Sequence, residues 1–176
     1  MNRRQVLKLS ALGSVMALGA GFAALPAGER PGLLSLEGAQ GYLRTLEGQS
    51  LVSLKGWGPT EVFNHCAQSI EYSMIGYPEL KPTWFRSSLG PLAFSVFSAR
   101  GAMRHPLGEI IPGAPALSEP ATQALALSRL QTAFSEFAAY SGELQPHFAY
   151  GTLSHADYAE AHVLHLYNHM SLIRLA

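Results

Sequence analysis

The sequence predicts an all-α protein, a bundle of four main helices with a short extra helix and a long proline-rich loop. In several segments apolar residues recur three and four positions apart, the spacing of helices with one buried face. Glycine and proline separate these segments and indicate where the helices end. No alternating run of apolar and polar residues is long enough to predict a strand.

Residues 1–27 have the features of a twin-arginine signal peptide. Arg3 and Arg4 are followed by an apolar residue, a leucine and Lys8, which is the order that such an export signal uses. Residues 9–27 carry no charge, but glycines and serines make them less apolar than a typical spanning helix. We therefore expect a cleaved signal and a periplasmic or otherwise exported protein, with no stable membrane insertion unless the signal stays uncleaved.

Residues 28–176 have the length of a single domain, the predicted helical bundle. They hold nine basic and twelve acidic residues, and this mild acidity makes a nucleic-acid partner unexpected. The one cysteine, Cys66, has no internal partner for a disulfide, so packing alone must hold the fold in an oxidising compartment. We expect a small molecule as substrate, and a homodimer is compatible with the sequence.

The first predicted helix covers about residues 33–46 and stops near Gly48. Pro59 suits the first turn of a second helix, which ends near residues 76–78. A shorter helix begins around Pro91 and runs toward Met103, and a further amphipathic helix spans about residues 125–138. The last helix begins after Ser154, an expected N-cap, and runs to about residue 173.

Residues 104–120 contain four prolines and two glycines, a composition that excludes regular structure. So long a connection in a compact domain is usually a lid or a binding loop, and a rigid crossover braced by proline is an equally good interpretation. In either case we expect this loop to border the entrance to the histidine cluster described next.

Three of the seven histidines lie in the last helix, at His162, His165 and His169. His165 and His169 are one turn apart and about 40° apart around the helix axis, so that both can bind one cation. With Tyr158 and Leu172, the three histidines follow the spacing of an inward-facing seam, where a bundle normally has leucine. Buried imidazoles need partners, and a shared cation would satisfy their nitrogens.

A pair of histidines four residues apart is weak support for a metal, because core histidines can instead bond to the backbone or to tyrosine. A third ligand should come from a facing helix, and His65 is the only histidine inside another predicted helix. Glu61, one turn earlier, could accept a hydrogen bond from its free ring nitrogen. We interpret Cys66 as a small core residue. The remaining histidines are His105, His147 and His155. We expect them to face solvent or cap turns, although any of them could still act on a substrate at the mouth of the bundle.

Three segments resemble the domain of unknown function 1569 family, which is related to the DinB/YfiT-like metal-binding bundles. They are residues 57–77 with His65, residues 111–115, and residues 150–154 leading into His165 and His169. The resemblance implies a DinB-like four-helix bundle that binds a divalent ion through His65, His165 and His169. Asn168 is a departure, because relatives often have a further histidine there.

The resemblance and the residues together predict an exported divalent-metal-binding bundle that is a metal-dependent enzyme, hydrolase or transferase-like. The metal would be zinc, nickel or manganese, and three neutral imidazoles would leave one coordination position open. An exported protein meets few reduced thiols, so hydrolysis is at least as reasonable as thiol-dependent transfer. Catalytic candidates are Tyr72 and His162. The alternatives are a non-catalytic module that binds a metal or small ligand, and a structural bundle.

Overall fold

The computed structural model describes residues 34–117 and 122–176. The predicted signal peptide and the end of the proline-rich loop therefore lie outside the described residues. The elements, in chain order, are α2 (Leu36–Thr45), β1 (Leu51–Ser53), α3 (Pro59–Ile75), α4 (Thr83–Arg86), α5 (Leu89–Arg100), α6 (Gln123–Ala139), α7 (His155–Met170) and β2 (Ile173–Leu175).

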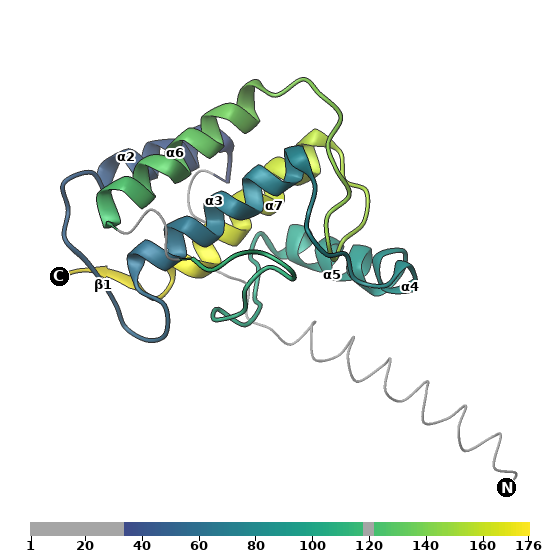
Figure 1. Cartoon of the computed structure of the whole chain (residues 1–176), viewed down its shortest axis with the longest axis horizontal. Coiled ribbons are helices and arrows are strands. Elements are labelled where there is room, and N and C mark those ends of the chain that lie inside the picture. The colour runs from purple at the N-terminus through teal and green to yellow at the C-terminus, as the bar shows by residue number, and fades with distance from the viewer. Residues whose placement is uncertain (1–33, 118–121) are drawn as a thin grey trace, which may run out of the picture.

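The protein is mostly helical, as predicted, and its longer helices lie side by side (Figure 1). Helix α3 packs most extensively against α6 and also contacts α7, while α2 lies against both α6 and α7. Helices α4 and α5 lie together, and α5 contacts α7. The core between the main helices contains the fully buried rings of Phe63, Phe134, Phe137 and Tyr158. This packing places α3 and α7, the two helices that carry the predicted metal ligands, in direct contact.

Helices α2, α6 and α7 begin at residues whose side chains satisfy free backbone N–H groups. Ser35 accepts from Gly38 N before α2, and Thr122 accepts from Leu125 N before α6. The capping box predicted for the last helix is present, because Ser154 and Asp157 bond to each other's backbone N–H. These caps fix the starts of α2, α6 and α7 and hence the direction in which their side chains point.

The prediction that the chain has no strands is wrong. Strands β1 and β2 form an antiparallel pair in which Val52 lies opposite Arg174. The last helix accordingly ends at Met170 rather than near residue 173, because the chain turns into β2. Strands of three residues are too short to produce a readable alternation, and their pairing depends on packing between distant parts of the chain. The short helix α4 was also not predicted.

The proline-rich loop has no helix or strand between residues 104 and 117, as predicted. Met103 and Ile111 are buried, at 6% and 3% exposure. From α3, Asn64 Nδ2 donates to Leu117 O at 3.5 Å and Gln68 Nε2 donates to Pro115 O at 3.4 Å. Over these residues the loop is therefore a braced crossover tied to α3.

None of the helices within residues 34–117 and 122–176 combines the length and the apolar character needed to cross a membrane.

Candidate metal centre

The structure brings together the three histidines that the sequence singles out. His65 lies on α3, and His165 and His169 lie one turn apart on α7. His65 and His169 are buried, at 3% and 1% exposure, and His165 is half-buried. The Nε2 atoms of His65 and His165 are 3.2 Å apart. One ring nitrogen from each of the three histidines lies within 4.8 Å of the other two.

The distance of 3.2 Å has two chemical explanations. Two neutral imidazoles at this separation can share an N–H···N hydrogen bond. Two nitrogens bound to one zinc ion at about 2.0–2.1 Å in a tetrahedral arrangement would be separated by roughly 3.3 Å, which is also close. The distance alone therefore does not distinguish the two, and the remaining ring nitrogens decide.

Three of those remaining nitrogens have no hydrogen-bond partner. Among the described residues, no partner contacts His65 Nδ1, His169 Nδ1 or His169 Nε2, and all three atoms are buried. A hydrogen bond between His65 and His165 would leave both nitrogens of His169 unsatisfied, at a cost of about 1–3 kcal/mol for each group. A divalent cation among the three rings would give one of the two nitrogens of His169 a partner, so the donor set fits a metal.

The electrostatics hold these rings in the neutral form that ligates metals. Burial, and then the neighbouring His105, lowers the pKa of His65 to about 4. Burial, and then His65 and His105, lowers the pKa of His169 to about 2. The pKa of His165 is also well below its ordinary value, first through burial and then through His169. All three imidazoles therefore present free lone pairs at neutral pH.

Aromatic rings surround the cluster on two sides. Trp57, which precedes α3, stacks on His169 with ring centroids 6.0 Å apart and an interplanar angle of 9°, and it also contacts His65. His105, from the proline-rich loop, has its ring centroid 5.0 Å from that of His165 and 5.1 Å from that of His169. The expectation that His105 faces solvent is therefore wrong, because the loop folds back over the cluster.

A cavity of about 210 Å³ opens beside the histidines. His65 and His165 form part of its wall, and the proline-rich loop contributes residues from His105 to Pro112. This confirms the prediction that the loop borders the entrance to the cluster. Polar groups from Ser69, Lys81 and Glu109 also line it, among apolar side chains such as Met103 and Ile111. A small molecule in this cavity would contact the histidines directly.

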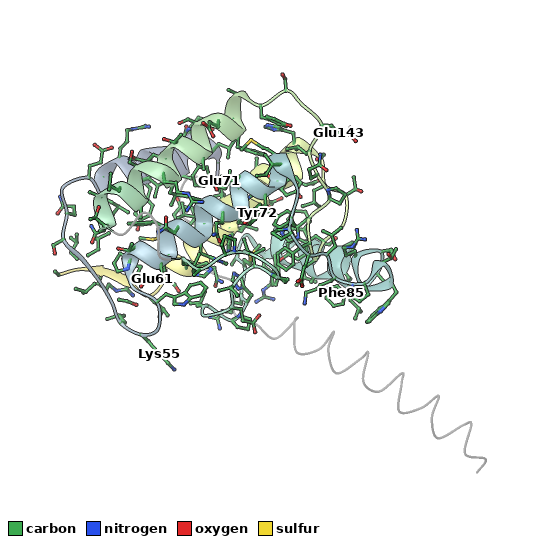
Figure 2. All side chains as sticks on the ribbon, in the orientation of Figure 1. Lys55, Glu61, Glu71, Tyr72, Phe85 and Glu143 are labelled. Carbon is green, nitrogen blue, oxygen red and sulfur yellow. The ribbon has the colours of Figure 1, made fainter. Side chains whose placement is uncertain are left out.

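Of the three residues that the sequence suggested as supporting groups, one lines the cavity and two do not contact the cluster as expected. His162 lines the cavity, but its Nε2 lies 3.2 Å from Ser73 Oγ, and it is not in the three-histidine group. Tyr72 is absent from the cavity wall, and its ring contacts Tyr77 two turns beyond His65. Glu61 does not accept a hydrogen bond from His65, whose Nδ1 has no partner in the described part of the chain. Figure 2 shows Glu61 at the beginning of α3 and Tyr72 toward its other end.

The other two histidines lie away from the cluster. His147 is buried rather than solvent-facing, but its Nδ1 accepts from the backbone N–H groups of Ala149 and Tyr150 at 3.1 Å, which confirms the other expectation, that it caps a turn. His155 is exposed at the start of α7, as expected. Cys66 is a buried free thiol, which confirms its interpretation as a core residue. Because its Nδ1 accepts, neutral His147 carries its proton on Nε2, in the wall of the cavity.

The fold and the site define a helical protein with three histidines clustered between two packed helices, beside a small cavity. A family model covers nearly all of the described chain, matching residues 33–175. The chain belongs to the family described as Protein of unknown function (DUF1569), which confirms the resemblance found in the sequence. No curated protein and no solved structure gives a match.

Proposed function

We propose that His65, His165 and His169 bind one divalent cation, zinc, nickel or manganese. The proposal rests mainly on the environment of His169, which belongs to a group of three converging imidazoles. Its side chain is buried, and its two ring nitrogens have no partner among the described residues. The inferred relationship to DinB-like metal-binding bundles supports the same ligand set. Binding would be strongest near and above neutral pH, where all three rings are neutral.

Three imidazole ligands leave a coordination position open, and the adjacent cavity gives a small molecule access to it. A metal there would supply Lewis-acid chemistry, polarising a carbonyl or a water for hydrolysis or group transfer. His147 Nε2–H and Lys81, both in the cavity wall, are donors that would orient a polar substrate. His162 supports the site through its hydrogen bond to Ser73, which ties α7 to α3 one turn before His165. We therefore favour a metal-dependent enzyme, hydrolase or transferase-like, over a binding module.

Elemental analysis of the purified protein tests the metal proposal. We expect about one zinc, nickel or manganese ion per chain in the wild type, and loss of the ion in His65→Ala, His165→Ala and His169→Ala. His155→Ala is the matched control, since this exposed histidine also lies on α7 and should leave the metal content unchanged. Wild-type protein that takes up no divalent ion even after dialysis against each of the three metals would overturn the proposal.

We further propose export of the folded, metal-loaded protein, because paired arginines precede a mildly apolar segment. Replacing Arg3 and Arg4 by lysine should leave the protein in the cytoplasm, as followed by cell fractionation. Export of the double variant at the wild-type level would refute a twin-arginine signal.

A further inference from the structure

His105 is held in one tautomer by its own loop. Its Nδ1 lies 2.8 Å from the carbonyl oxygen of Pro106. A carbonyl oxygen only accepts hydrogen bonds, so Nδ1 must carry the proton, and Nε2 must carry a lone pair. The Nε2 atom is buried and has no hydrogen-bond partner in residues 34–117 and 122–176. The structure therefore holds an unused acceptor beside the three-histidine cluster.

This acceptor is close to the cluster without belonging to it. The ring of His105 contacts His165 and His169 at centroid distances of 5.0 and 5.1 Å. The group whose nitrogens all lie within 4.8 Å of one another nevertheless consists of His65, His165 and His169 alone, within the described residues. His105 thus lies next to the proposed metal ligands without being one of them. At this position a group bound to the metal would reach its Nε2.

The loop around His105 is fixed well enough to hold such a position. Met103 and Ile111, on either side, are buried, and Gln68 from α3 bonds to the carbonyl oxygen of Pro115. His105 also lines the same cavity as His65 and His165. The cavity, the three-histidine cluster and the buried lone pair of His105 are therefore close neighbours.

We propose that His105 Nε2 accepts a hydrogen bond from a protic group, a water or a hydroxyl, in the open coordination position, so that the centre favours protic over aprotic ligands. This inference rests on the proposed function, because it requires a metal at the three histidines. It makes His105 a ligand-positioning residue. It also names the substrate class as small molecules that reach the metal through an O–H group.

Azide binding to the cobalt-loaded full-length protein tests the inference. Azide has no proton to donate, so that when it displaces a bound water the hydrogen bond to His105 is lost. A net hydrogen bond is worth about 0.5–1.5 kcal/mol, which corresponds to about a 2- to 12-fold change in affinity. In His105→Leu, which removes the acceptor and keeps the bulk, we expect azide to bind tighter by this factor in titrations followed by the cobalt absorption bands. In His105→Gln, which keeps an acceptor, azide affinity should stay near the wild-type value.

The outcomes separate this inference from the metal proposal. Wild-type protein that binds no cobalt would overturn both. Cobalt binding with equal azide affinity in the wild type and the leucine variant would overturn only the role of His105. A leucine variant that folds but no longer binds cobalt would show that His105 is a direct ligand and would also overturn it. If the leucine variant does not fold, as judged by circular dichroism, His105→Ala takes its place with the same expected change.

Discussion

Replacing His169 by leucine should have opposite effects on stability without and with metal. His169 is 1% exposed, and both of its ring nitrogens lack a partner among the described residues. Without metal, the protein therefore carries two unsatisfied polar groups in its interior. Leucine has a similar size and no polar atoms, so the His169→Leu variant should be more stable than the wild type in the metal-free state.

The magnitude follows from the two nitrogens. Each unsatisfied buried group costs about 1–3 kcal/mol, and water entering the adjacent cavity offsets part of the total, so we expect a gain of about 2 kcal/mol. For a domain of this size, that gain raises the Tm by about 4–8 °C. With metal the order reverses, because the wild type gains about 2.7 kcal/mol at a metal concentration one hundred times the Kd and the variant gains nothing.

Thermal unfolding followed by circular dichroism, with chelator and then with zinc, measures both effects. We expect the variant to have the higher Tm in chelator and the wild type to have the higher Tm in zinc. A metal-free variant that melts below the wild type would show that His169 is satisfied in the native state. A variant whose Tm rises with zinc as much as that of the wild type would show that His169 is not a ligand.

Three further changes test other parts of the structure. Burial, and then His155, lowers the pKa of His162 to about 3. An unfolded histidine titrates near 6.5, so as the pH is lowered the unfolded state binds the proton before the native state does. The urea concentration at the unfolding midpoint should therefore decrease as the pH is lowered from about 6.5 to about 3. In His162→Gln it should decrease less steeply with pH, and equal slopes in the two proteins would contradict this. Gly90→Ala should destabilise the protein by about 1–3 kcal/mol or more, because its Cβ would overlap the carbonyl oxygen of Ala149. Gly41→Ala in α2 should not lower the Tm, because its Cβ would meet Arg44 Nη2 at an ordinary contact distance of 3.7 Å. Ser154→Ala should cost about 1 kcal/mol in thermal unfolding through loss of the cap, and an unchanged Tm would show that the capping box adds nothing.

The sequence alone predicted most of the helical architecture and the three clustered histidines. Helical periodicity places His165 and His169 on one face of α7, and His65 lies on the buried side of α3. These predictions succeeded because the 3.6-residue repeat determines which side chains share a face, whatever the rest of the chain does.

The position of His105 was beyond such reasoning. A loop has no repeat, so its direction depends on the burial of Met103 and Ile111 and on the bonds from α3. The tautomer of His105 depends on a single contact with the Pro106 carbonyl. Similarly, His147 is buried because its ring packs against Tyr77 and Tyr158 from distant parts of the chain, which composition does not reveal. The useful clue in the sequence was the loop's length and proline content, which predicted that it would cover the site.

The contact between His65 and His165 joins residues 100 positions apart. Contacts between such distant residues close a long loop and are entropically costly to form. A metal that binds only after α3 and α7 have packed together would leave the folding rate nearly unchanged and would slow unfolding instead. The bound ion would then act as a reversible cross-link that sets the lifetime of the native protein, a property that matters most where an unfolded molecule is degraded before it can refold.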